Sequence, residues 1–156
     1  MTLLISKYDT VIQEMPDHIS LAFYCKGCSL RCKGCHSPEL QTLKHGILLT
    51  NQLFYNILEN YNKYITNVLF FGGEWEEQRL IELLDIVRSL YPFLKITLWT
   101  GLDYNEVSPL LLGKLDYIKT GRYDERRGDI TNPNTNQKLI DINNFLDITS
   151  RTFHKQ

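Results

Sequence analysis

Residues 25–39 read Cys-Lys-Gly-Cys-Ser-Leu-Arg-Cys-Lys-Gly-Cys-His-Ser-Pro-Glu, and they contain all four cysteines of the 156-residue chain. The residues between the cysteines are Lys, Gly, Ser, Leu and Arg, most of which a buried core would exclude. One flexible loop of this kind can bring several thiolates together on iron or zinc. The stretch therefore predicts a metal-binding loop, and we expect the rest of the fold to support it.

The overall composition is ordinary for a globular fold. With 43% hydrophobic and 22% charged residues, the chain is expected to form a single domain over residues 1–156. No basic leader follows Met1 and no apolar run approaches the ~20 residues of a membrane span, so we expect a cytoplasmic protein that binds no membrane. Clustered thiols in a reducing cytoplasm bind metal more often than they pair as disulfides. A net charge of −1 gives no general attraction to nucleic acid.

Short apolar strands alternate with helical patterns along the chain, which predicts right-handed crossovers and a mostly parallel sheet. A full eight-stranded barrel needs ~250 residues, so the expected fold class is α/β, a partial and laterally open (β/α) barrel. The expected strands cover residues 10–14, 18–24, 67–71, 95–99 and 116–119, with a last edge strand within 145–153. The expected helices run from an N-cap at Thr50 through residue 58, over residues 76–91, and over residues 104–112 with Pro109 as a kink.

Four loops follow expected strands: the cysteine loop, Gly72-Gly73-Glu74, Thr100-Gly101 and Thr120-Gly121. Because the carboxyl ends of parallel strands meet at one rim, we expect these loops to form the active site together. Residues 122–137 are polar and rich in turn formers, which predicts a long loop.

The cysteines allow more than one metal site. Cys25 with Cys28 and Cys32 with Cys35 form two CxxC pairs, as in a four-thiolate zinc site, although zinc ribbons normally place a longer loop between the pairs. A ferredoxin-like cluster with four thiolates is a second alternative, but its cysteine spacings follow a different order.

Read as Cys28-x3-Cys32-x2-Cys35, three cysteines resemble the CxxxCxxC signature of the radical S-adenosylmethionine superfamily. The resemblance implies that these three thiolates are the metal ligands of a [4Fe-4S] cluster, whose open iron chelates S-adenosyl-L-methionine through its amino and carboxylate groups. It also implies a barrel of that superfamily's type. Cys25 would then be a thiol outside the cluster, or a fallback ligand in the absence of S-adenosylmethionine.

The sequence Gly72-Gly73-Glu74 resembles the GGE motif of the same superfamily. The resemblance implies that the glycine backbone approaches the methionine moiety of the cofactor and that the acid accepts from its amino group. A solvated acid at a helix start is the alternative for Glu74. Thr100 either touches S-adenosylmethionine or caps the following turn.

Residues 27–39 are similar to the small activating proteins of anaerobic ribonucleotide reductases, which also carry a glycine, here Gly34, before the third cysteine. Residues 70–75, 98–101 and 135–137 resemble further elements of that group, and the likeness covers most of residues 18–140. It departs from the pattern at Trp75, where proline is common, and at the extra Cys25. The likeness implies that Gly34, Cys35 and His36 border the cofactor; His36 as an iron ligand is a lesser alternative.

The resemblance implies a glycyl-radical-generating activase, a radical S-adenosylmethionine oxidoreductase. An electron from a flavodoxin-like or other low-potential donor would reduce the cluster, S-adenosylmethionine would be cleaved to a 5′-deoxyadenosyl radical, and that radical would take hydrogen from a glycine Cα of anaerobic ribonucleotide reductase. No catalytic residue beyond the cluster ligands is needed. The short chain favours a protein substrate, to which Arg122, Arg126 and Arg127 would either dock or remain solvated.

Three other functions remain open. They are an activase of another glycyl-radical enzyme, a radical S-adenosylmethionine enzyme acting on a small molecule, and a zinc-binding interaction module without catalysis. The sequence leaves open which glycine is attacked, the electron donor, the stoichiometry with the reductase and self-association.

Overall fold

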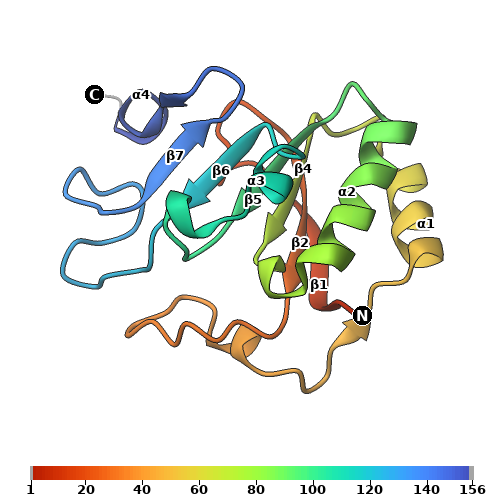
Figure 1. The fold of residues 1–156 in the computed structure, drawn as a ribbon, viewed down its shortest axis with the longest axis horizontal. Coiled ribbons are helices and arrows are strands. Elements are labelled where there is room, and N and C mark those ends of the chain that lie inside the picture. Colours follow the sequence, from red (N-terminus) through yellow and green to blue (C-terminus); the bar gives the residue numbers. More distant parts are fainter. Residues whose placement is uncertain (1, 155–156) are drawn as a thin grey trace.

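In a computed structural model, which describes residues 2–154, the chain forms one eight-stranded sheet with helices packed against it (Figure 1). The strand order is β3-β1-β2-β4-β5-β6-β7-β8. The strands are β1 Leu4–Val11, β2 Ser20–Cys25, β3 Ile47–Leu48, β4 Asn67–Phe71, β5 Lys95–Trp99, β6 Tyr117–Thr120, β7 Lys138–Asp141 and β8 Leu146–Asp147. The helices are α1 Asn51–Tyr61, α2 Glu77–Leu90, α3 Pro109–Leu112 and α4 Thr149–Phe153, with 3-10 turns η1 Pro38–Gln41, η2 Glu74–Glu76 and η3 Tyr104–Glu106.

The centre of the sheet is parallel, as the alternating pattern predicted. Strands β2, β4, β5 and β6 run side by side in the same direction, so their carboxyl ends meet at one rim. The flanking strands β1, β3, β7 and β8 pair antiparallel, which the sequence did not indicate. The parallel part is thus confined to the centre of the sheet, and a barrel of the radical S-adenosylmethionine type stays a prediction.

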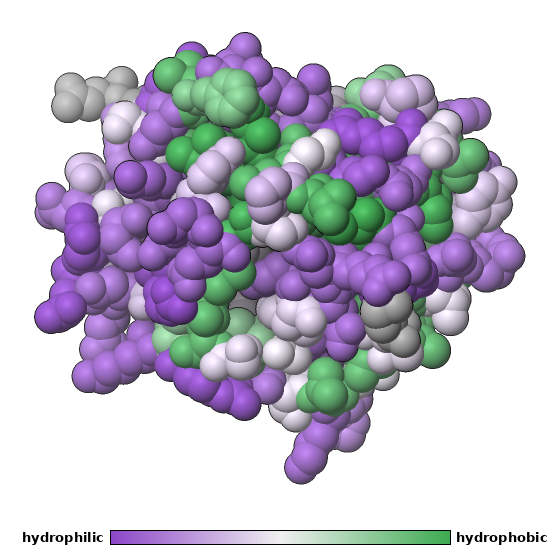
Figure 2. All heavy atoms as spheres, in the orientation of Figure 1, coloured by the Kyte–Doolittle hydropathy of each residue, from purple (hydrophilic) through white to green (hydrophobic). Residues whose placement is uncertain are grey.

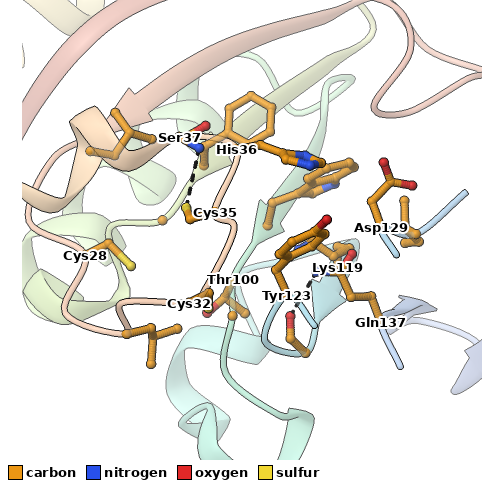
Figure 3. Close-up of a pocket in the computed structure, with 18 of the residues that line it drawn as sticks. Cys28, Cys32, Cys35, His36, Ser37, Thr100, Lys119, Tyr123, Asp129 and Gln137 are labelled. Carbon is orange, nitrogen blue, oxygen red and sulfur yellow. Dashed lines mark hydrogen bonds between the residues drawn. The ribbon is translucent and has the colours of Figure 1, made fainter. Parts of the chain in front are cut away.

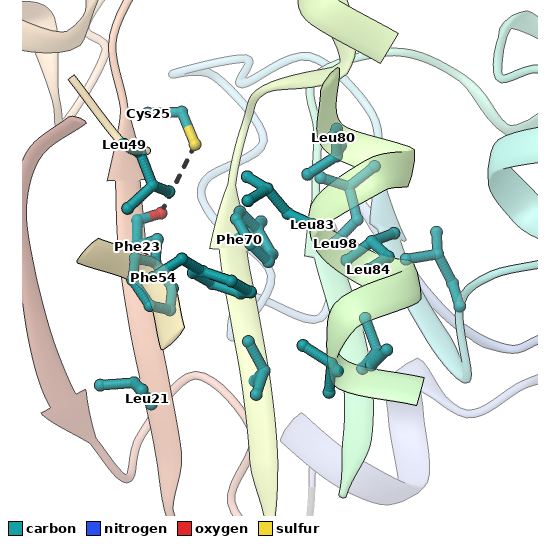
Figure 4. Packing of buried hydrophobic residues seen from close by; sticks show 14 of the residues in the cluster. Leu21, Phe23, Cys25, Leu49, Phe54, Phe70, Leu80, Leu83, Leu84 and Leu98 are labelled. Atoms are coloured by element: carbon teal, nitrogen blue, oxygen red, sulfur yellow. Dashed lines mark hydrogen bonds between the residues drawn. The ribbon is translucent and has the colours of Figure 1, made fainter. Parts of the chain in front are cut away.

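The main core lies between the sheet and helices α1 and α2 (Figures 1 and 4). Alternate residues of each strand point to this side, so that Phe23 of β2 and Phe70 of β4 stack with ring centroids 5.2 Å apart, and Phe54 of α1 lies 5.1 Å from Phe23. Helix α1 begins at the predicted cap, where the Thr50 hydroxyl accepts from the backbone N–H of Leu53 at 3.1 Å. Burying each large apolar side chain contributes about 1.5–3 kcal/mol.

The opposite side of the sheet carries polar and aromatic side chains. Asn67 donates to the Ser20 hydroxyl at 3.0 Å and accepts from the Thr97 hydroxyl at 2.9 Å, all three residues being fully buried. Nearer the rim, Tyr24 stacks on Phe71 at 4.6 Å, and Phe71 meets Trp99 edge-on at 5.4 Å. This side of the sheet therefore leads to the rim through a row of aromatic rings.

Two predicted elements differ from the structure. The strand predicted at 10–14 is β1 instead, which ends where Val11 pairs with Ser20, and Ile12 beyond it is 65% exposed. The helix predicted over 104–112 is split into η3 and α3. Proline has no N–H to donate but fits the first position of a helix, so Pro109 starts a helix instead of kinking one.

The predicted last strand within 145–153 is mostly helix α4, with only Leu146–Asp147 forming β8. The reason is that the side chain of Thr149, and not the backbone of a neighbouring strand, accepts the hydrogen bond of a strand N–H group. The Thr149 hydroxyl accepts from the backbone N–H of Leu139 at 2.8 Å and donates to Asp147 at 2.6 Å, which turns the chain out of the sheet. Strand β7, which Leu139 belongs to, was not predicted.

Between residues 2 and 154, none of the helices has the length and apolar character needed to cross a membrane. The surface on the helix-covered side is mostly polar, with apolar residues in separate small patches (Figure 2).

Candidate functional site

The carboxyl ends of the parallel strands open into a cavity of about 470 Å³, within the size range of small-molecule and cofactor sites (Figure 3). Seven of the nine residues that the sequence indicated line this cavity: Cys28, Cys32, Cys35, His36, Gly72, Glu74 and Thr100. The other two, Gly34 and Gly73, do not line it. Strand ends that are far apart in the sequence thus bring the cysteine loop and the Gly72-Gly73-Glu74 turn to one cavity. The binding roles of these residues stay predictions.

The cysteine loop lacks regular structure around its three half-buried thiols. Its start is held by the carbonyl of Leu40, which accepts from the N–H groups of Gly27 and Cys28 at 2.7 and 3.1 Å. The N–H of Ser37 donates to the Cys35 sulfur at 3.4 Å. Burial raises the pKa of the Cys28 thiol, and the nearby Glu74 adds to this shift, so a bound metal would compensate the cost of forming the thiolate.

The chemistry of these thiols fits an iron–sulfur cluster. Within residues 2–154, no three Cys, His, Asp or Glu side chains gather as the ligands of one ion would. In a [4Fe-4S] cube each thiolate binds a different iron, so the three sulfur atoms need not converge on one point. The donor set of Cys28, Cys32 and Cys35 on one loop at one cavity therefore fits such a cluster.

Cys25 is separated from the other three thiols by burial. It ends strand β2, is fully buried in the main core, and its Sγ donates to the carbonyl of Phe23 at 3.9 Å (Figure 4). Although it borders the cavity, its sulfur is engaged with the core. This arrangement argues against the four-thiolate zinc and ferredoxin-like alternatives.

Glu74 carries an orphaned polar atom in the cavity. Its Oε1 accepts from the Thr100 hydroxyl at 2.7 Å, whereas its Oε2 is buried and has no hydrogen-bond partner within the described chain. Burial raises the pKa of Glu74, and the Thr100 hydrogen bond opposes this shift. A buried carboxylate oxygen without a donor is costly, so the site fits a ligand that brings an N–H group. Glu74 does begin the 3-10 turn η2, as that alternative expected, but its Oε2 is not solvated.

Thr100 itself is a cap as well as a partner of Glu74. Its hydroxyl oxygen also accepts from the backbone N–H of Leu102 at 3.0 Å, which fixes the turn after β5. Of the two roles expected for Thr100, the structure shows the cap, while contact with S-adenosylmethionine stays a prediction.

The turn after β4 requires its two glycines. Gly72 and Gly73 have φ angles of +77° and +105°, and a Cβ on Gly72 would lie 2.4 Å from the ring of Trp75. The same indole donates through Nε1 to the carbonyl of Lys26 at 3.1 Å. Trp75, which stands where proline is common, therefore ties this turn to the start of the cysteine loop.

The long loop 122–137 packs against the cysteine loop. The rings of Tyr123 and His36 lie 4.7 Å apart, and Glu125 pairs with Lys33 at 3.1 Å. The three arginines considered for docking have partners within the protein: Arg122 pairs with Glu106, Arg126 with Asp124, and Arg127 donates to the carbonyl of Asn134.

Sequence reasoning missed Lys119 and Trp99, which line the cavity beside the cysteines. The Lys119 ammonium lies over the Trp99 ring, 5.0 Å from its centroid, and the indole N–H of Trp99 is buried without a partner in the described residues. The signal in the sequence was a lysine near the end of an otherwise apolar strand, just before Thr120-Gly121.

The chain as a whole is similar to known iron–sulfur and activating proteins. A protein-family profile described as "4Fe-4S single cluster domain" matches residues 19–140. The chain is 24% identical over 111 residues to the anaerobic ribonucleoside-triphosphate reductase-activating protein of Enterobacteria phage T4, a match that covers 67% of this chain and 71% of the phage protein. No solved structure matched the chain. The predicted likeness to reductase-activating proteins is thereby confirmed.

Proposed function

Because the chain belongs to the family of 4Fe-4S single cluster domains, we propose that it is an activase that cleaves S-adenosylmethionine reductively and generates a glycyl radical on anaerobic ribonucleotide reductase. The phage relative, named as a reductase-activating protein, supports the activase type. The observation that carries the proposal is the cavity lined both by three thiols of one loop and by Glu74, whose Oε2 has no hydrogen-bond partner in the described residues.

Each residue of the cavity has a definite task in this proposal. Cys28, Cys32 and Cys35 would hold the cluster, which when bound supplies the electron for cleavage of S-adenosylmethionine. Glu74 Oε2 would accept from the amino group of the methionyl moiety, and Thr100 holds the carboxylate in place for this contact. The bare backbone of Gly72 leaves room for the ring of Trp75, which packs on the turn that carries Glu74.

The proposed partners follow from the same chemistry. The substrate is the glycyl-radical subunit of anaerobic ribonucleotide reductase, and a flavodoxin-like or other low-potential protein supplies the electron. We place this activity in the reducing cytoplasm, where free thiols persist and bind metal.

Anaerobic reconstitution with iron and sulfide, followed by EPR of the reduced protein, tests the proposal. We expect a [4Fe-4S]⁺ signal that changes when S-adenosylmethionine is added, and a glycyl radical after mixing with the reductase. Glu74→Gln should keep the signal but need about tenfold to a hundredfold more S-adenosylmethionine to change it, because a charge-assisted hydrogen bond is weakened. Glu76→Gln, in the same turn, is the matched control and should behave as the wild type. Bound zinc without a cluster would refute the proposal.

A further inference from the structure

Lys119 is a buried cation that the proposed function leaves without a task. It lies on β6, lines the same cavity as the cysteines, and is only 8% exposed. Among residues 2–154 its ammonium has no hydrogen-bond or salt-bridge partner, and its one defined contact is the face of Trp99 at 5.0 Å. The structure thus holds a positive charge at the site without a direct anionic partner.

Burying an unpaired charge is expensive. The desolvation penalty of a buried ion exceeds what a cation–π contact returns. Burial accordingly lowers the pKa of Lys119 to about 8, and the neighbouring Cys32, Glu74 and Cys35 oppose that shift. The groups that favour its charged form thus include two of the three predicted cluster ligands.

The negative charge of the proposed cluster gives a reason for a buried ammonium group in this cavity. Three thiolates around a [4Fe-4S]²⁺ core leave a net negative charge, and uptake of one electron adds another. In a cavity of low dielectric, a nearby fixed cation favours the more negative state. Reduction potentials of such clusters follow their net charge and surroundings in this way.

We propose that Lys119 is the counter-charge of the cluster, held against Trp99 so that its ammonium stabilises the reduced form and raises the reduction potential. The inference rests on the proposed cluster. The step concerned is the one-electron reduction of the cluster by an external donor, in which no bond is made or broken and Lys119 transfers no proton. Lys119 is thus a positioning charge and not a catalytic residue.

Lys33 provides a matched control. It is the immediate sequence neighbour of Cys32, yet its side chain is 88% exposed and pairs with Glu125 at 3.1 Å. Water and salt screen such a charge. The two lysines therefore separate the effect of a buried charge from that of mere proximity in the sequence.

The test is an EPR-monitored redox titration of the reconstituted full chain without S-adenosylmethionine, using dithionite as reductant. In Lys119→Met we expect the ratio of reduced to oxidised cluster at a fixed ambient potential to fall about tenfold, which is about 59 mV for one electron. Lys119→Arg should restore most of the ratio, and Lys33→Met should change it by no more than about twofold. Lys119→Gln repeats the comparison if Lys119→Met fails to assemble a cluster.

Two results would overturn the inference, and they differ from failure of the proposed function. An unchanged potential in Lys119→Met and Lys119→Gln, or an equal shift in Lys33→Met, refutes the role of Lys119 alone. A wild-type chain that assembles no cluster refutes the proposed function, and the inference falls with it.

Discussion

At the scale of single residues, burial separates Cys25 from the other cysteines. Burial raises the pKa of Cys25 far above its ordinary value, and the charge of Glu74 adds to the shift, so its thiolate does not form at neutral pH. We therefore expect iodoacetamide to label Cys28, Cys32 and Cys35 in the native apo-protein but to spare Cys25, as measured by peptide mass spectrometry.

Labelling in denaturant is the control and should modify all four cysteines. The variant Cys25→Ala should still assemble a cluster, because its sulfur is directed into the core. Rapid native labelling of Cys25, or loss of the cluster in Cys25→Ala, would show that it is a ligand after all.

The sequence indicated the residues whose spacing carries the chemistry. Cys28, Cys32 and Cys35 lie within one loop and Glu74 follows a strand, and their resemblance to two known motifs was enough to propose them. The presence of Lys119 at the site and the contacts of Trp75 were beyond its reach, because these contacts join different strands and loops. Spacing along the chain reports neighbours within an element, whereas neighbours across a sheet depend on pairing and register.

At the scale of elements, Trp75 links the turn after β4 to the start of the cysteine loop by packing on one and donating a hydrogen bond to the other. Trp75→Phe removes the hydrogen bond to the Lys26 carbonyl and also the distal indole atoms that pack on Gly72. We expect the free energy of unfolding of the apo-protein to fall by about 1 kcal/mol, measured by denaturant titration. Tyr64→Phe, at a side chain that is 71% exposed, should leave it unchanged. Equal stability of Trp75→Phe and wild type would mean that the hydrogen bond contributes nothing.

Element prediction succeeded where the pattern was local and failed at the edges of the sheet. The apolar runs of β4 and β5 and the capped start of α1 are set by neighbouring residues, and their positions were correct. The direction in which β7 pairs is decided by a contact with β6 across a polar loop, and no periodicity encodes it. The two-residue strands β3 and β8 are too short to show any pattern.

At the scale of the whole molecule, loops from two separated strands meet over the cavity. The cysteine loop follows β2 and the loop 122–137 follows β6, and β4 and β5 lie between those strands in the sheet. The loops nevertheless touch through the rings of His36 and Tyr123 and the ion pair of Lys33 with Glu125. A change that orders the backbone of one loop should therefore also order the backbone of the other.

Cluster assembly is expected to order both loops, because ligation fixes the cysteine loop and the contacts of Tyr123 and Glu125 transmit this order. Hydrogen–deuterium exchange with mass spectrometry should show slower exchange in residues 26–37 and 122–129 after reconstitution. In Tyr123→Ala/Glu125→Ala only residues 26–37 should slow, while α1, which lies in the helix layer, stays unchanged in both proteins. If residues 122–129 respond equally in the double variant, the contacts do not carry the coupling, and the two loops sense the cluster separately.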